Sequence, residues 1–211
     1  MKYRGTPCDI VYLAGHETDA CVPTIHPSFI FHGNYPYSSV LIADLKKAVG
    51  HLKESIVVPE RELLIGPSYS DVASFLHHCS QTERVAFDTE VLNHQVSCIS
   101  FSCDPLQAMS IPFVGEGGRD YWTLEEEGMI WLMIAKILGD EKIQKINQNI
   151  LFDIQFLWQR NSIITRGQVD CTMCAFGVMY PDLPKDLGFI LSLTTKEPYY
   201  KDDKKLWSKP W

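Results

Sequence analysis

The sequence lacks an excess of positive charge. Its 211 residues contain 19 Lys and Arg against 26 Asp and Glu, so the formal net charge is -7 at pH 7. Proteins that hold nucleic acid by their own charge carry a basic face, and this composition disfavours that mode of binding. Contact with nucleic acid would instead require a local basic patch, or metal ions that turn carboxylates into a phosphate site.

Long apolar runs and closely spaced cysteines are lacking too. No stretch approaches the about 20 apolar residues of a membrane-spanning helix. The first apolar run, interrupted by Cys8 and Asp9, is shorter than the apolar region of a signal peptide. The seven cysteines are odd in number and scattered, which does not fit a disulfide framework. We therefore expect a soluble protein of a reducing, cytoplasmic compartment, with no membrane partner.

The sequence does contain 45% hydrophobic residues, enough for one sizeable core or for one domain and a smaller appendage. Its character changes where KESIVVPERELLIGPSYS mixes charges with two prolines and a glycine. We expect an appendage, a linker and a main domain at residues 1–55, 56–69 and 70–211. Within the appendage, the pattern of apolar residues predicts a strand at residues 9–15 and a helix at residues 38–52. The helix has apolar residues at helical spacing, namely Ile42, Leu45, Val49 and Leu52.

The sequence of the main domain predicts strands that alternate with helices. Three apolar, β-branched or aromatic runs predict a β-meander, and Thr123 with Glu126 forms a capping-box pattern before a helix that Gly139 can end. The expected strands are residues 84–90, 95–102, 107–113 and 142–147, and the expected helices are residues 70–79, 124–138, 149–159, 171–179 and 183–193. This order favours an α/β fold with helices covering a mixed sheet.

Two acids end the first predicted strand of the meander. In VAFDTE, Asp88 and Glu90 share one face of the strand, and Thr89 points to the other. If the carboxylates are buried, their repulsion and lost hydration cost several kcal/mol, which a divalent metal or hydrogen-bond donors must offset. If the strand ends at Phe87, the acids are ordinary solvated loop residues. The spacing alone leaves both interpretations open.

A third acid lies in a strongly apolar predicted helix. In NQNILFDIQFLW, Asp153 has apolar neighbours on nearly every side, which predicts a buried helix and an acid that needs a metal or another partner. Asn149, one turn earlier on the same face, would supply a polar contact. The alternative is that Asp153 and Asn149 form a single exposed polar stripe.

Together these motifs resemble the DEDD superfamily of 3′-5′ exonucleases, and most closely the proofreading domain of family A DNA polymerases, including those of phages. VAFDTE is similar to the first motif of the family, and NQNILFD to the second. The β-meander and the segment VDCTMCAFGVMYPDLPKDLGFI also fit, so the resemblance covers roughly residues 70 to 200. It implies a ribonuclease H-like mixed sheet covered by helices, with a small N-terminal appendage.

The resemblance implies hydrolysis with two metal ions. Asp88, Glu90 and Asp153 would hold two Mg²⁺ or Mn²⁺ ions, while Thr89 and Asn149 would contact the substrate, a single-stranded DNA 3′ end. A polymerase domain in the same longer polypeptide, in bacterial or phage-infected host cytoplasm, would be the partner. Bases would stack on aromatic side chains such as Phe87, Phe101, Phe152 and Trp158, although core packing is the expected role of each.

The family also requires a fourth acid, and here the sequence departs from the pattern. Tyr199 and Asp203 have the spacing of the third motif, but they lie in a charged segment without apolar periodicity. The other interpretation is that the third motif lies beyond Trp211, in which case this chain is truncated and inactive. A non-catalytic module that binds nucleic-acid ends, and an RNA-processing member of the superfamily, therefore stay as alternatives.

Four smaller features complete the sequence. PTIHPSFIF and ADLKKA resemble the C-terminal end of family 4 uracil-DNA glycosylases, with His26 as the base-contacting residue, but no earlier motif is present and we expect no glycosylase activity. Cys171 and Cys174 have the spacing of half a zinc site or a redox pair, and their apolar surroundings favour core cysteines. Asp170 is expected to cap the following helix. For His77, His78 and His94 we expect a surface role.

Overall fold

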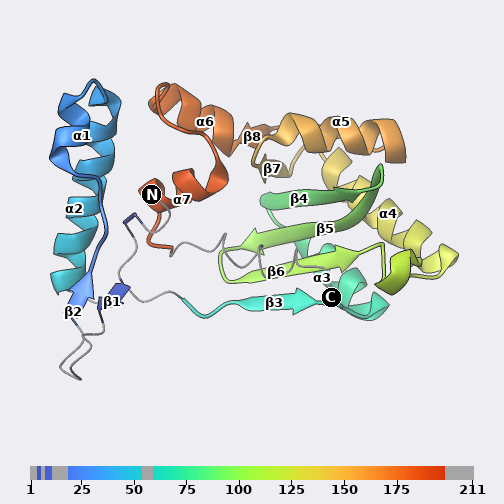
Figure 1. The fold of residues 1–211 in the computed structure, drawn as a ribbon. Helices are drawn as coiled ribbons and strands as arrows, with labels where there is room; N and C mark the ends of the chain where they lie inside the picture. The colour runs from blue at the N-terminus through green and yellow to red at the C-terminus, as the bar shows by residue number, and fades with distance from the viewer. Residues whose placement is uncertain (1–3, 6–7, 11–18, 54–58, 198–211) are drawn as a thin grey trace. The chain divides into compact units, whose positions relative to one another are not determined.

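A computed structural model describes residues 4–5, 8–10, 19–53 and 59–197. Tyr199 and Asp203 lie outside these residues. The chain forms two compact units, Met1–Val58 with Phe176–Trp211, and Pro59–Ala175 (Figure 1). Among the helices of the described residues, none is long and apolar enough to cross a membrane.

The larger unit contains a six-stranded mixed sheet in the order β3-β6-β5-β4-β7-β8 (Figure 1). The antiparallel β4, β5 and β6 form the predicted meander, and β3, β7 and β8 each pair in parallel with a neighbour. The strands are β3 (Glu62–Ile65), β4 (Arg84–Leu92), β5 (Gln95–Asp104), β6 (Gln107–Pro112), β7 (Gln144–Asn147) and β8 (Val169–Cys171). The predicted α/β class is confirmed.

Two strands of this sheet were not predicted from the sequence. β3 lies inside residues 56–69, which the composition assigned to a linker, and its backbone pairs with β6 from Glu62 to Ile65. Leu63 and Ile65 are 60% and 80% exposed, so this edge strand has little of the alternating burial that makes a strand recognisable. β8 has three residues, too few to show a period of two.

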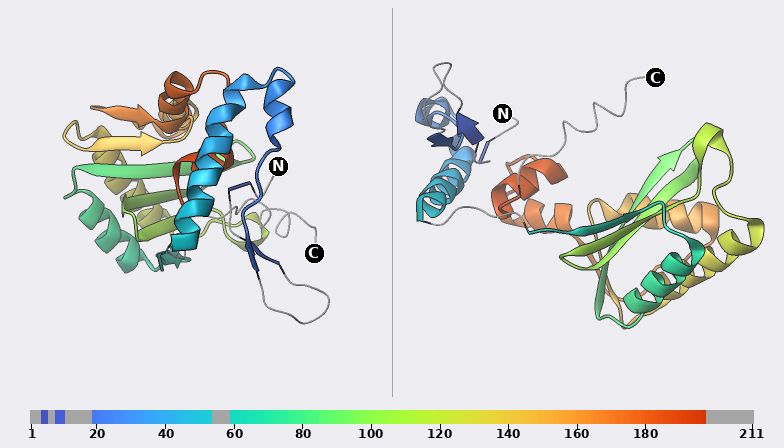
Figure 2. Two further views of the ribbon diagram at one scale, coloured as in Figure 1. Left: turned by 90° about the vertical axis from the view of Figure 1, so that its left-hand side faces the viewer. Right: turned by 90° about the horizontal axis from the view of Figure 1, so that it is seen from below.

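Helices α3 (Tyr69–Cys79) and α4 (Leu124–Gly139) pack on one face of the sheet (Figure 2). Their N-termini carry capping boxes, Ser68 with Asp71 and Thr123 with Glu126, and the second confirms the sequence prediction. The core that they share with the sheet includes Val72, Leu76, Val85, Phe87, Ile99, Phe101, Met109, Ile111, Ile130, Ile134 and Ile137. Helices α5 (Ile150–Asn161) and α6 (Thr172–Met179) follow β7 and β8.

The smaller unit combines two segments that are far apart in the sequence. It contains β1 (Cys8–Ile10), β2 (Asp19–Cys21), α1 (Pro27–Phe31), η1 (Tyr35–Tyr37), α2 (Ser38–Lys53) and α7 (Leu187–Thr194). Ile25 and Val40 share a core with Phe176, Leu183 and Ile190. Residues 176–197, which the sequence assigned to the main domain, therefore pack with the N-terminal segment.

A buried ion pair decides which side of α2 faces this core. Asp44 is 1% exposed and pairs with the guanidinium of Arg4, which also donates a hydrogen bond of 2.6 Å to Ser192 Oγ. The buried side of α2 therefore carries Val40 and Asp44. By contrast, the residues that the sequence placed at helical spacing, Ile42, Leu45 and Val49, are each 52% exposed. Lys47 lies nearby, and burial, followed by the charge of Arg4, lowers its pKa.

His26 has a local structural role in this unit. It is the N-cap of α1, where its Nδ1 accepts a hydrogen bond of 3.2 Å from the N–H of Ser28. The same nitrogen lies 2.6 Å from Ser28 Oγ. The side chain of His26 therefore caps the helix that begins at Pro27.

Gly167, just before β8, allows a close backbone approach that a side chain would prevent. Its φ is +79°, and a Cβ atom there would lie 2.6 Å from the carbonyl oxygen of Glu141. We expect Gly167→Ala to lower the free energy of unfolding by about 1–3 kcal/mol, because it adds both backbone strain and a clash. Urea denaturation followed by circular dichroism measures this change. Gly128→Ala is the matched control, since Gly128 lies inside α4 with nothing within 4 Å, and it should stabilise by up to about 1 kcal/mol.

Candidate functional site

Asp88 and Glu90 lie within β4 and not beyond its end. The strand continues to Leu92, and its side chains alternate, so that Phe87 and Thr89 are buried while both acids are exposed. The interpretation of the acids as loop residues after Phe87 is therefore wrong. Asp88 and Glu90 point to the sheet face opposite the one that α3 and α4 cover.

Small polar side chains surround the two acids on the open face. Asp88 is paired with Ser100 of β5, which is paired with Ser110 of β6, and Glu90 is paired with Cys98. Burial raises the pKa of the Cys98 thiol, a hydrogen bond with Ser110 opposes this, and the negative charges of Glu90 and Asp88 raise it further. The cross-strand neighbours of the two acids on this face, Ser100 and Cys98, therefore have small side chains.

Asp153 is fixed to β4 by hydrogen bonds. Its side chain is on the buried side of α5, where the residue is 3% exposed. The backbone N–H of Thr89 donates to Asp153 Oδ1 over 3.0 Å, and the Thr89 hydroxyl donates to the same oxygen. The parallel ladder of β4 and β7 ends at Ala86 and Ile146, so Asp153 takes the place of a strand partner for Thr89. Neither bond involves Asp153 Oδ2.

Helix α5 differs from its prediction in two respects. Leu151, Phe152 and Trp158 are 73%, 52% and 59% exposed, so the expectation of a fully buried helix is wrong. Only the stripe that contains Asp153 faces the core, together with Ile150 and Leu157.

Asn149 does not share a helical face with Asp153. It is the exposed N-cap of α5 in the left-handed conformation, with φ 60° and ψ 40°, and its side chain makes no capping hydrogen bond. The polar contact beside Asp153 comes instead from Thr89, which sequence reasoning placed on the face away from Asp88 and Glu90. The alternation of side chains along the strand correctly predicted the face to which Thr89 points. It could not predict that Thr89 bonds to Asp153, because Asp153 lies on a helix that begins 61 residues later.

The three acids supply a donor set that suits hard divalent cations. All their ligand atoms are carboxylate oxygens, which Mg²⁺ and Mn²⁺ prefer over sulfur or nitrogen. Asp88 and Glu90 are accessible on the open face, and Asp153 is anchored beside the same strand. Within the described residues, however, the three do not form a group whose ligand atoms all lie within 4.8 Å of one another.

One buried amide near this site was missed by the sequence analysis. Asn147 ends β7 with 5% exposure, and no described residue forms a hydrogen bond with either of its side-chain polar atoms. Its signal in the sequence is an amide at a buried position of a strand, where an apolar residue is expected.

The residues before and in α6 also differ from expectation. Asp170 belongs to β8 and accepts a hydrogen bond from the side-chain amide of Gln144, so its predicted capping role is wrong. Cys171 is half-buried and packs against the core, whereas Cys174 is exposed, so the expectation of two buried core cysteines is wrong. Burial would raise the pKa of Cys171, but hydrogen bonds from the N–H groups of Cys174 and Ile150 and from the Cys174 thiol give a net lowering.

Known structures share the fold of the described chain. No protein-family model and no curated protein matches the sequence. The Nibbler EXO domain of Aedes aegypti matches with a TM-score of 0.55 and 11% identity over 73% of this chain and 78% of that domain. The Trypanosoma brucei RNase D in complex with RNA gives a TM-score of 0.53 and 12% identity over 69% of this chain and 51% of that one.

Escherichia coli RNase D, an exoribonuclease involved in structured RNA processing, gives a TM-score of 0.50 and 14% identity over 70% of this chain and 36% of its own. The chain thus spans about half or less of each RNase D chain. The ribonuclease H-like fold of exonuclease domains is confirmed. The finer resemblances, to polymerase proofreading domains and to glycosylases, stay predictions.

The bond between Thr89 and Asp153 can be tested through stability. Thr89→Val removes the hydroxyl donor while keeping a similar shape, and it should lower the free energy of unfolding by about 1–3 kcal/mol. Urea denaturation measures the change. In an Asp153→Ala background the same substitution should cost much less, because the acceptor is gone. Equal costs in the two backgrounds would show that the hydroxyl does not stabilise the fold through Asp153.

Proposed function

We propose that this protein is a metal-dependent 3′-5′ exonuclease that removes nucleotides from single-stranded nucleic-acid ends. The observation that carries this proposal is the pair of hydrogen bonds that hold Asp153 beside the strand bearing Asp88 and Glu90. Asp153 follows Glu90 by 63 residues in the sequence, and both motifs belong to a fold shared with exonuclease domains.

In this proposal all three acids bind metal, but Asp153 is held in a different way from Asp88 and Glu90. Asp88 and Glu90 bind metal from the open face of the sheet, where a polymer can approach. Thr89 holds Asp153 in one orientation through two hydrogen bonds to Oδ1, and in this proposal Oδ2 binds metal. The chemistry that two bound ions supply is activation of a water molecule and neutralisation of phosphate charge. Such ions also resolve the conflict between a net charge of -7 and an anionic substrate.

Exposed aromatic side chains on α5, the helix that carries Asp153, support a single-stranded substrate. Phe152 precedes Asp153, is 52% exposed and stacks on Phe156 with ring centroids 6.1 Å apart. Trp158 is also exposed, whereas Phe87 and Phe101 are core residues at 3% and 1%. We propose that Phe152 and Trp158 provide stacking surfaces for bases, because stacking tolerates any sequence and needs unpaired bases.

Two polymers are candidates for the substrate. The resemblance of VAFDTE and NQNILFD to proofreading domains supports DNA, and with it a role beside a polymerase. The similarity to an RNase D that binds RNA supports an RNA substrate as the second candidate. The carboxylates by themselves do not distinguish the sugars, since the 2′-hydroxyl is recognised by other groups.

A nuclease assay tests the activity. The full chain is incubated with Mn²⁺ and 5′-end-labelled single-stranded DNA or RNA of the same sequence, and we expect stepwise shortening from the 3′ end. Asp88→Asn and Asp153→Asn should each reduce the rate by about 100-fold or more, because each removes an anionic ligand of the metal ions that stabilise negative charge on the reacting phosphate. Glu125→Gln, an exposed acid on α4, is the control and should leave the rate unchanged.

The ratio of the rates on the two polymers decides between DNA and RNA. If neither polymer is shortened while the protein still binds the 3′ ends of the 5′-labelled strands, the protein is a non-catalytic end-binding module. That second function is favoured by one observation, the absence within the described residues of a tight cluster of all three acids. Shortening that persists in both Asp→Asn variants would refute the assignment of the site.

A further inference from the structure

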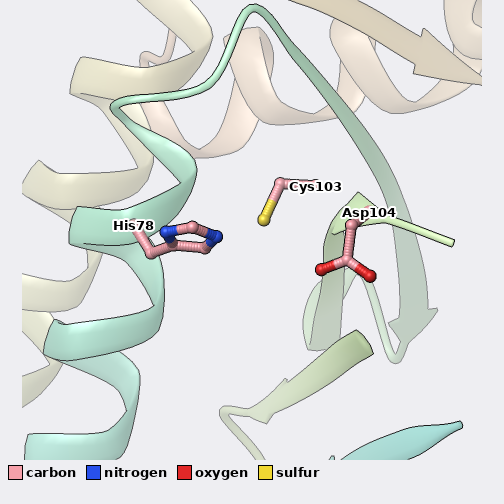
Figure 3. Close-up of side chains that lie close together, drawn as sticks. All are labelled: His78, Cys103 and Asp104. Atoms are coloured by element: carbon pink, nitrogen blue, oxygen red, sulfur yellow. The ribbon is translucent and has the colours of Figure 1, made fainter. Parts of the chain in front are cut away.

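A second group of metal-binding side chains lies away from the three acids. His78 of α3 and Cys103 and Asp104 of β5 each direct one ligand atom into a common space, and these atoms all lie within 4.8 Å of one another (Figure 3). His78 and Asp104 are exposed and Cys103 is half-buried, so an ion can reach the group from solvent.

A bulge in β5 brings two consecutive residues to the same point. Neighbouring residues of a regular strand point to opposite faces, so Cys103 and Asp104 would normally be separated by the sheet. The register between β5 and β6 shifts between Phe101 and Asp104, which re-aims the side chains there. The last turn of α3, which carries His78, packs over this end of the strand, where Cys103 contacts the core.

Both sulfur and carboxylate ligands already have supporting contacts. Asp104 Oδ1 accepts the N–H groups of Leu106 over 2.7 Å and Gln107 over 3.1 Å, and neither bond involves Oδ2. The thiol of Cys79, which is buried, forms a hydrogen bond with Cys103. Outer contacts of this kind fix ligand orientation in metal sites, and a thiol donor stabilises a neighbouring thiolate.

The donor set identifies the chemical class of ion. One imidazole nitrogen, one thiolate sulfur and one carboxylate oxygen suit Zn²⁺, whereas Mg²⁺ and Ca²⁺ require oxygen. We propose that His78, Cys103 and Asp104 bind one zinc ion, with water in the fourth position. The ion would clamp the C-terminal end of α3 to the β5–β6 hairpin.

This site is independent of the proposed nuclease centre. Cys103 packs on the covered side of the sheet with α3, and Asp88 and Glu90 point to the opposite face. Zinc would act here on stability, because an ion that binds only the folded chain shifts the unfolding equilibrium. At a zinc concentration 100 times Kd, the midpoint of thermal unfolding should rise by about 5–10 °C.

Cobalt spectroscopy tests the ligands directly. The full chain, reduced and freed of metal, is titrated with Co²⁺, and we expect thiolate-to-cobalt charge-transfer absorption that one equivalent of Zn²⁺ removes. Cys103→Ser should abolish this absorption. Loss of an outer-shell partner typically weakens metal affinity by about 10- to 100-fold. His78→Ala removes a direct ligand, so it should weaken zinc affinity by more than this. Because His78 is exposed, that variant keeps the test valid even if Cys103→Ser fails to fold.

Matched controls use neighbouring residues of the same types. His77→Ala, also exposed on the last turn of α3, and Cys98→Ser, beside Glu90 on the other face, should keep the absorption. Asp88→Asn should keep it while losing nuclease activity, which separates this site from the proposed function. The proposal is overturned if the parent chain shows no charge-transfer absorption with Co²⁺, or if Cys98→Ser removes it.

Discussion

The hydrogen bonds from Thr89 to Asp153 join the centre of the sheet to helix α5. A buried carboxylate costs several kcal/mol unless donors satisfy it, and both donors come from one residue of β4. Beyond Ala86 the strand has no partner in β7, so Asp153 also satisfies a backbone N–H that would otherwise be unpaired. The orientation of α5, and with it the position of its exposed aromatic residues, depends on this contact.

The two faces of the sheet in the larger unit carry different kinds of side chain. Strict alternation in β4 sends Val85, Phe87 and Thr89 to the covered face and leaves Asp88 and Glu90 on the open one. A shift of one residue would bury both acids against α3 and α4 and expose the aromatic core. The open face thus exposes both carboxylates to solvent. On the covered side the bulge at Cys103 creates a softer donor set at the rim of the core.

The smaller unit is organised by a different buried charge. Arg4 pairs with Asp44, donates to Ser192 and lies 5.2 Å from the ring centroid of Phe189. Thr24 donates a further hydrogen bond of 2.6 Å to Asp44. These contacts join segments almost 190 residues apart in the sequence, so the N-terminal segment and α7 form one core. The N-terminal segment, which the sequence analysis treated as an appendage, is in this way part of a compact unit.

The sequence by itself determined the elements with strong periodicity and local signals. The meander, the capping box of Thr123 with Glu126, helix α4, and the alternation that places Asp88 and Glu90 on one face all follow from neighbouring residues. Only the tertiary structure decided which side of an apolar helix is buried. Asp44 and Asp153 face inward because Arg4 and Thr89, distant in sequence, satisfy them, and the exposed apolar residues of α2 and α5 lie opposite. Edge strand β3 and the group of His78, Cys103 and Asp104 also depend on partners far along the chain, which no local pattern contains.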